Sequence, residues 1–286
     1  MTGRRIALLI DGGFFLKRLP SLVKPEHRDS PERIAITLRH LCRNHVKMLT
    51  GVTGRDWVEP VYRTFYYDSM PYDGVAHHPV LNRQIDFAKS DVAKDRLALF
   101  DCLRRQRKPA LRLGKVNREH DWAIAPSLTK RLLRNRQALQ ALAALPSPTA
   151  AKESITPDLV LTPAQVQELV ALRDLWLSLD AGSVALGLKQ KGVDMRIGVD
   201  IASLALKKHV NTIVLVAGDS DFVPAAKLAR REGVDFILDP LWQKINADLF
   251  EHIDGLQSGL ARPGAANRTT ETATAATEET EQPNGP

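Results

Sequence analysis

The stretch that decides the fold is TIVLVAGDSDFVPAAKLARREGVDFIL, residues 212–238. It begins with an unbroken apolar strand predicted over Thr212–Val216, continues into a helix over Asp221–Glu232 and returns to a strand over Asp235–Leu238. A strand that is apolar throughout is typical of a parallel sheet, because helices cover both of its faces. Acidic side chains follow directly on the first of these strands, in the GDSD turn at 218–221.

The same alternation of strand and helix extends toward the N-terminus. Further strands are predicted at Arg5–Ile10, Glu59–Tyr67 and Ala110–Val116, and further helices at Pro31–Leu49, His78–Arg107, Thr162–Leu179 and Val193–Lys208. Ser30 and Thr162 stand where N-caps are expected, each followed by a proline in the first turn. We therefore predict a three-layer α/β/α fold with a mainly parallel central sheet.

Composition and charge limit the class of protein. The chain has 286 residues, of which 44% are hydrophobic and 26% charged, as in a globular protein with a full core. Its apolar runs are far shorter than the roughly 18 residues that span a membrane, so no membrane partner is expected. Only two cysteines occur, far apart and in no zinc-binding pattern, which favours the cytoplasm. The net charge of +7 suits a polyanionic partner, although it also fits an ordinary basic protein.

Two regions depart from a minimal domain of this kind. Residues 1–260 are predicted to form one domain that carries a helical insertion at about 117–185. The remainder, 261–286, is rich in Thr, Ala, Glu and Pro and is predicted to be a disordered low-complexity tail. The insertion is a candidate surface for a protein partner or for self-association.

Aspartates stand at the ends of several predicted strands. Asp11 follows the first strand, Asp219 and Asp221 follow Thr212–Val216, and Asp239 follows Asp235–Leu238. Parallel sheets bind ligands beyond the carboxyl ends of their strands, so these side chains are expected at one edge. Each aspartate alone is well explained as a helix cap or a turn residue. Together they repel one another unless a cation compensates them, which predicts Mg²⁺ or Mn²⁺.

A further acidic contribution comes from the segment that begins at Lys191. Asp194 and Asp200 are six residues apart, which is about 240° of rotation on a regular helix, so they do not share a face. Asp194 is a candidate N-cap or metal ligand. Asp200, at the boundary of the apolar face, is a candidate for a salt bridge or for a site residue.

Basic residues that could hold a nucleic-acid backbone are concentrated between 104 and 118. This segment contains seven Lys or Arg residues, including Arg112 and Lys115, and no acid. A solvated helix face explains the run equally well. Lys191 is a more specific candidate for a phosphate contact, and Ser220 could donate a hydrogen bond to a phosphate or merely complete its turn.

Three segments resemble the NYN domain proteins, specifically the LabA-like (DUF88) branch of the PIN-like nuclease superfamily. They are IALLIDGGFF at 6–15, KGVDMRIGVDIASLA at 191–205 and TIVLVAGDSDFVPAAKLARREGVDFIL at 212–238. The GDSDF segment is fairly specific, whereas DGG alone is weak. The family often has Asn shortly after the first Asp, as in DGxN; Phe14 and Phe15 occupy that region here.

The resemblance implies a PIN-like fold and metal-dependent cleavage of RNA. The metal ligands it implies are Asp11, Asp194, Asp219 and Asp221, and the catalytic residues are Asp11, Asp200, Asp219 and Asp221. The cofactor is expected to be Mg²⁺ or Mn²⁺. The nucleic-acid contacts that we expect beside this site are Lys191, Ser220, Arg112 and Lys115.

Other classes of protein fit less well. A phosphatase of the haloacid dehalogenase type needs a second acid two residues after its nucleophile, and position 13 is Gly. A dinucleotide-binding enzyme needs GxGxxG after the first strand, which is absent. The alternative that remains is an RNA-binding or regulatory protein that keeps the fold without turnover. An interaction scaffold that uses the insertion and the tail is compatible with either.

Overall fold

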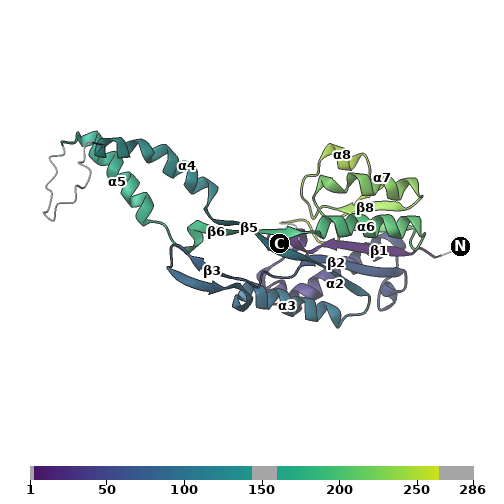
Figure 1. The fold of residues 1–286 in the computed structure, drawn as a ribbon. Helices are drawn as coiled ribbons and strands as arrows, with labels where there is room; N and C mark the ends of the chain where they lie inside the picture. The colour runs from purple at the N-terminus through teal and green to yellow at the C-terminus, as the bar shows by residue number, and fades with distance from the viewer. Residues whose placement is uncertain (1–2, 144–159, 264–286) are drawn as a thin grey trace, which may run out of the picture. The chain divides into compact units, whose positions relative to one another are not determined.

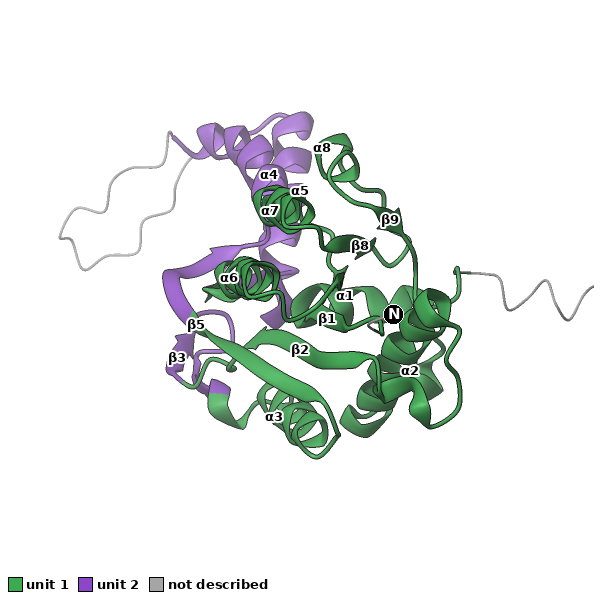
Figure 2. Cartoon of the chain, turned by 90° about the vertical axis from the view of Figure 1, so that its right-hand side faces the viewer, with its two compact units in different colours: residues 1–73, 88–116, 190–286 green, residues 74–87, 117–189 purple. Residues whose placement is uncertain are grey.

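The computed structural model describes residues 3–143 and 160–263. The chain forms two compact units (Figure 2). Unit 1 consists of residues 1–73, 88–116 and 190–286, and unit 2 of residues 74–87 and 117–189. The predicted low-complexity tail lies outside the described residues beyond 263.

The chain contains a seven-stranded sheet (Figure 1), in the order β6-β5-β2-β1-β7-β8-β9, and all of its strands except most of β6 and the second half of β5 belong to unit 1. The strands are β1 (Ile6–Asp11), β2 (Val61–Ser69), β5 (Pro109–Ile124), β6 (Val184–Lys191), β7 (Thr212–Val216), β8 (Asp235–Asp239) and β9 (Gly255–Leu256). From β5 to β9 every neighbouring pair is parallel. The predicted mainly parallel sheet is thus confirmed.

Helices cover both faces of this sheet. The helices on one face are α1 (Gly12–Leu22), α2 (Pro31–Thr50) and α3 (Asp91–Arg104), and those on the other are α6 (Val193–Leu206), α7 (Val223–Arg231) and α8 (Ala247–Phe250). Alternate residues of β1 enter the two cores: Ile6, Leu8 and Ile10 pack with the first group, and Ala7 and Leu9 with the second. The three-layer α/β/α architecture is therefore as predicted.

The two tyrosines of β2 follow the same rule. Tyr66 packs in the first core and Tyr67 in the second, and both are completely buried. Neither ring is available to stack on a nucleic-acid base.

The order of the strands reverses beside β1. From β1 the chain first builds outward through β2 and β5, and later returns to add β7, β8 and β9 on the other side. The boundary between β1 and β7 is consequently the topological switch point, where parallel α/β sheets leave a crevice at the carboxyl ends of their strands.

Local signals placed several helices correctly. The Ser30 hydroxyl accepts a hydrogen bond from the amide of Arg33 and caps α2, which ends at Gly51 in the left-handed conformation. Thr162 caps α5 (Pro163–Leu177) in a capping box with Gln165. Short 3₁₀ segments occupy Pro25–His27, Asp56–Val58, Phe87–Lys89, Arg136–Leu142, Ala181–Ser183 and Ser220–Phe222.

The helix predicted over His78–Arg107 is wrong in its first part. Residues there form a hairpin of β3 (Val75–His78) and β4 (Arg83–Asp86), and the helix starts only at Asp91, behind the Ser90 N-cap. Asn82 turns the hairpin with a φ of 50°, a conformation that a helix excludes. Helix α1 and strand β6 were not predicted, and β5 runs well beyond the predicted Ala110–Val116.

Unit 2 has a small core of its own. Helix α4 (Pro126–Asn135), the 3₁₀ segment Arg136–Leu142 and α5 bury Leu132, Ala138, Leu172 and Leu175 together. Strands β5 and β6 continue into this unit. They run antiparallel, because Gly114 of β5 lies against Lys191 of β6, whereas His120, further along β5, lies against Gly187, which comes earlier in β6. The helices of unit 2 fall within the predicted insertion.

Candidate functional site

The carboxyl edge of the sheet brings together acidic residues from separate strands. Ile10 of β1 is in register with Val216 of β7, so the residues that follow them, Asp11 and the turn 217–221, emerge side by side. This is the edge at which the sequence predicted an aspartate cluster, and it coincides with the topological switch point.

Asp11 ends β1 and caps α1. Its Oδ1 accepts a hydrogen bond of 3.0 Å from the amide of Phe14. Burial, with smaller contributions from the charges of Asp194 and Asp68, raises the pKa of Asp11 to about 6, against the lowering effect of the Phe14 amide. The raised pKa means that a negative charge on Asp11 is costly unless a cation lies nearby.

The GDSD turn after β7 presents two exposed carboxylates. Asp219 caps the 3₁₀ segment Ser220–Phe222, with Oδ1 accepting from the amide of Asp221 at 3.1 Å. The side chain of Asp221, which the sequence allowed as a helix cap, does not cap α7. Its carboxylate is therefore not needed for the start of that helix.

Phe14 occupies the place of the asparagine in the DGxN pattern. A Cβ built on Gly218 would lie 2.5 Å from the ring of Phe14, so this ring packs directly on the turn after β7. Any side chain at 218 would displace it. Where the family pattern has a polar asparagine, this chain therefore has an apolar contact between the turn after β1 and the turn after β7.

Asp194 reaches the same edge from the first turn of α6. Gly192, with a φ of 76°, makes the left-handed turn that leads from β6 into this helix. Burial raises the pKa of Asp194, and the charges of Asp219 and Asp221 raise it further. These repulsions show that the three carboxylates are electrostatic neighbours.

Asp200 is placed differently from Asp194, although both lie on α6. Its Oδ2 accepts hydrogen bonds of 2.9 Å from the Tyr67 hydroxyl and from Nε of Arg112. Arg112 also lies over the ring of Phe65, 5.1 Å from its centroid. Asp200 therefore holds Arg112 in place, and the structure does not bring it into the group formed by the other four predicted acids.

Asp68, at the end of β2, is an acid that the sequence analysis missed. It is 1% exposed and pairs with Arg96, while its Oδ1 accepts from the amide of Ser69 at 2.8 Å. Its charge contributes to the raised pKa of Asp11. The available signal was its position one residue beyond the strand predicted to end at Tyr67.

Gln190 is a second residue that the sequence analysis did not single out. A Cβ on Gly13 would lie 3.4 Å from Oδ1 of Asp11 and 3.6 Å from Oε1 of Gln190, so an amide side chain lies beside the acidic group. No motif marks this glutamine. Only the path of β6, which was itself not predicted, brings it here.

Asp239 shares the edge but is completely buried. Its carboxylate receives hydrogen bonds from the amides of Leu241 and Gly259, both 2.8 Å long, and lies 2.7 Å from Nε2 of His45. With these partners it holds the loop after β8 and the segment around Gly259 in place. The turn explanation offered by the sequence is the one that this geometry favours.

The predicted nucleic-acid contacts are separated by the fold. Arg112 is level with Asp11 across the sheet, because both are in register with Tyr67. It lines a cavity of about 400 Å³ together with Met195 and Arg196 of α6. Lys115 is exposed one residue beyond the β2–β5 pairing.

Lys191 and Ser220 complete the predicted set. Lys191 is exposed at the end of β6, immediately before the turn into α6, and Ser220 is half-buried between Asp219 and Asp221. The backbone oxygen of Lys191 lies against Gly114 of β5, so its side chain stands at the carboxyl edge of the sheet.

The acidic group has the chemistry of a site for a hard divalent cation. Asp11, Asp194, Asp219 and Asp221 form no ion pair with a Lys, Arg or His within residues 3–143 and 160–263. In the same residues, no three Asp, Glu, His or Cys side chains converge closely enough to hold a metal ion as they stand. The donors are thus of the right kind and in one place, but they do not form a closed chelate.

Fold and site together define a three-layer α/β protein with an acidic group at its topological switch point. Residues 170–251 match the family model of the NYN domain, a match that is consistent with an NYN domain protein of the PIN-like superfamily. The match includes Asp194, Asp200, Asp219 and Asp221, and it does not extend to Asp11 or distinguish the LabA-like branch. It supports a hydrolase of the nuclease type.

Other comparisons add little. No curated protein matches the chain. Among solved structures, the chain is similar to a protein of unknown function from Vibrio parahaemolyticus, with 12% identity and a TM-score of 0.36 over 89% of this chain and 91% of the other. Such a likeness carries no functional argument. Among the described residues, no helix has the length and hydropathy required to cross a membrane.

Proposed function

We propose that this protein is a ribonuclease that cleaves RNA phosphodiester bonds with Mg²⁺ or Mn²⁺ bound at the carboxyl edge of its sheet. The observation that carries the proposal is the group of four aspartates without cationic partners, Asp11, Asp194, Asp219 and Asp221. Burial raises the pKa of Asp11 and of Asp194, and repulsion from neighbouring carboxylates adds to the shift of each. A bound divalent cation would remove this cost.

The side chains have the freedom to close around an ion. Asp194, Asp219 and Asp221 are all exposed, so a change of rotamer meets little packing resistance. Asp11 is the fixed member, held by the Phe14 amide. We therefore assign Asp11 as the anchor of the metal site and the three exposed carboxylates as the ligands that move toward it.

The remaining residues would bind and orient the RNA. A bound divalent ion would lower the pKa of a water and stabilise the leaving oxygen of an in-line displacement. Arg112, which donates to Asp200 and is oriented by it, would bind a phosphate beside the site, and the Tyr67 hydroxyl fixes Asp200 in turn. Lys115 and Lys191 extend the positive charge along this edge, and Ser220 would donate a hydrogen bond to a phosphate oxygen. Asp200 acts in this scheme as a positioning residue.

The branch and the setting are part of the proposal. The GDSDF and KGVD segments support the LabA-like (DUF88) branch, in the order in which they occur here. Both cysteines, Cys42 and Cys102, are free thiols, which supports a reducing cytoplasmic environment.

The test is a cleavage assay on fluorescently labelled single-stranded and hairpin RNA with the full-length protein. We expect cleavage with Mg²⁺ or Mn²⁺, none with EDTA, and a loss of about a hundredfold or more in Asp219→Asn. Asp29→Asn is the matched control, because Asp29 is exposed and lies before α2, outside the acidic group. Cleavage that persists unchanged in Asp219→Asn would refute the assignment.

A second candidate is an RNA-binding protein without turnover. It is favoured by Phe14, which fills the place of the family's asparagine and packs on Gly218. In that case the wild type and Asp219→Asn bind RNA with the same affinity, and neither cleaves it with either metal.

A further inference from the structure

A cavity of about 670 Å³ lies at the amino ends of β2 and β5. Its walls come from the middle of α2, from the segment 54–58 that precedes β2, and from the segment 105–107 that precedes β5. The aspartates of the proposed metal site follow the carboxyl ends of their strands. The cavity is therefore at the other edge of the sheet, and it is formed by residues of unit 1 alone.

The lining of this cavity is strongly basic. It includes Arg39, His40, Arg43, Arg55, Arg105 and Arg107, and no Asp or Glu. Part of the basic run at 104–118 that the sequence offered as a groove for RNA thus faces this cavity instead. Arg107, with Arg63 and Arg5, also lowers the pKa of Lys108, after the effect of burial. Positive charge is concentrated here without compensation.

The five arginines of the cavity differ from many others in this protein. None of them forms an ion pair with a carboxylate in the described part of the chain. Elsewhere, aspartates pair with Arg4, Arg96, Arg104, Arg112, Arg118, Arg173 and Arg230. Guanidinium groups left without partners around one hollow are suited to bidentate binding of phosphate.

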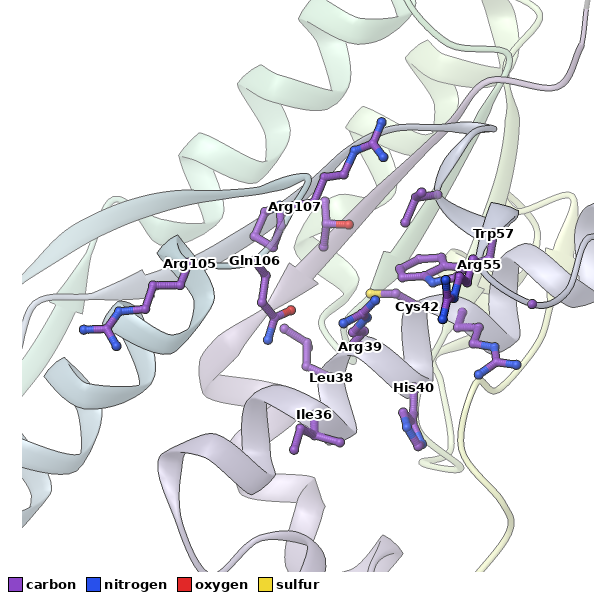
Figure 3. A pocket seen from close by; sticks show the side chains of 15 residues that line it. Ile36, Leu38, Arg39, His40, Cys42, Arg55, Trp57, Arg105, Gln106 and Arg107 are labelled. Carbon is purple, nitrogen blue, oxygen red and sulfur yellow. The ribbon is translucent and has the colours of Figure 1, made fainter.

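One wall of the cavity is apolar. Trp57, which is 6% exposed, lies beside Cys42 in the floor, and Ile36, Leu38 and Val58 also contribute to the lining. In Figure 3, Arg39 and Arg55 lie near Trp57 and Cys42, whereas the guanidinium of Arg105 points away from them. A bare anion needs only the cations. A hydrophobic wall next to them suits a ligand that also has a flat apolar part.

We propose that this cavity binds a nucleoside phosphate, with its phosphates on Arg39 and Arg55 and its base against the apolar wall. The volume is that of a typical small-molecule site, which ranges from about 300 to 1,000 Å³. A discrete hollow of this size favours a single nucleotide over a strand of RNA. The site is independent of the proposed metal site, because it shares no residue with it.

The experiment is calorimetric titration of the full-length protein with adenosine diphosphate in the presence of EDTA. Inorganic pyrophosphate, adenosine and a ten-nucleotide single-stranded RNA serve as comparison ligands. The test variant is Arg39→Gln/Arg55→Gln, and the matched control is Arg33→Gln, an exposed arginine on the same helix α2 that does not line the cavity. Circular dichroism checks that each variant is folded.

We expect adenosine diphosphate to bind, pyrophosphate to bind about tenfold more weakly, and adenosine not to bind measurably. The double variant should lose about tenfold or more in affinity, because two charge-assisted contacts are removed, and Arg33→Gln and Asp219→Asn should bind as the wild type does. The proposal is overturned if adenosine diphosphate gives no heat at millimolar concentration, if pyrophosphate binds equally well, if Arg33→Gln weakens binding as much as the double variant, or if only the RNA binds.

Discussion

Four neighbouring parallel strands, in the order β2, β1, β7 and β8, each bring an aspartate to the same edge of the sheet. The outer two, Asp68 and Asp239, are buried and have Arg96 and His45 as partners. The inner positions, represented by Asp11, have no cationic partner. The same residue type at equivalent strand ends thus has two different roles, and the two groups differ in whether the carboxylate has a basic side chain, Arg96 or His45, as a partner.

The difference teaches how to distinguish a structural carboxylate from a functional one. A buried carboxylate that is paired and hydrogen-bonded stabilises the fold, because its removal leaves the partner unsatisfied. A group of carboxylates that repel one another destabilises the fold, and such an arrangement is a candidate for a ligand site. Substitutions of Asp68 and of Asp11 should therefore change stability in opposite directions.

The largest effect is expected at an outer position. Asp68→Asn removes the carboxylate that pairs with Arg96, whose side chain is 24% exposed, and should lower the free energy of unfolding by about 3–5 kcal/mol. Urea unfolding followed by circular dichroism measures this change. Asp219→Asn is the control from the inner group, because asparagine keeps the cap of the 3₁₀ segment, and it should change stability by less than about 0.5 kcal/mol. Equal effects at both positions would remove the distinction between paired and unpaired aspartates.

The next effect has the opposite sign. Because the pKa of Asp11 is about 6 in the folded protein and 3.8 in the reference state, folding binds a proton between these values and stability falls as the pH rises through this window. Above pH 6 the cost is fully present, about 3 kcal/mol at most. Asp11→Asn keeps the cap to Phe14 and removes this cost.

The measurement is a pair of urea titrations of the metal-free protein, at pH 4 and at pH 7.5. The variant should be more stable than the wild type at pH 7.5 and nearly equal to it at pH 4. Asp29→Asn, at an exposed position outside the acidic group, should show no such dependence. A destabilised Asp11→Asn at pH 7.5 would place Asp11 with the outer aspartates.

Metal binding should sharpen the comparison further. Mn²⁺ at about a hundred times its Kd should stabilise the wild type by about 2.7 kcal/mol, because a ligand bound only to the folded state adds this amount. The gain should shrink below pH 6, where Asp11 is protonated. Thermal unfolding with and without Mn²⁺ measures it. The gain should remain in Asp68→Asn and disappear in Asp11→Asn; equal stabilisation of both variants would contradict metal binding at the inner group.

The sequence predicted the positions of the aspartates better than their tasks. Asp11 and the GDSD turn were found because each follows directly on an apolar strand. Asp68 was missed because β2 contains Tyr, Arg and Thr, so its end is not marked by a change in hydropathy. Whether an aspartate is paired depends on contacts that are distant in sequence: 28 residues separate Asp68 from Arg96, and 194 separate Asp239 from His45. No local pattern carries that information.

The same limit explains the errors in the fold. The parallel sheet could be predicted, because strands buried on both faces are continuously apolar. The β3–β4 hairpin could not, because the residue types of VAHH and RQID do not alternate between apolar and polar, although the burial of β3 does alternate. Helix α1 contains Pro20, which argues against a helix when only the sequence is known. Its buried contacts through Phe15 and Leu19 override that preference.

The smallest effects are expected on α6, where two aspartates six residues apart repeat the contrast between paired and unpaired groups. Asp200→Asn weakens the ion pair with Arg112. Because the side chains are partly exposed, 43% for Arg112 and 21% for Asp200, the substitution should lower the free energy of unfolding by only about 1 kcal/mol. Asp194→Asn relieves the repulsion from Asp219 and Asp221, so it should not destabilise the metal-free protein. Urea unfolding at pH 7.5 compares the two variants.

RNA binding separates their functional roles. Asp200→Asn should weaken binding severalfold without metal, because Arg112 loses the acceptor that orients it, and Arg112→Gln should produce the same loss with no further effect when both changes are combined. Asp194→Asn should leave metal-free binding intact and weaken only the response to Mn²⁺. If Asp200→Asn instead abolishes the response to Mn²⁺ while leaving metal-free binding unchanged, Asp200 belongs to the metal group, and the geometry of α6 then has to change when the ion binds.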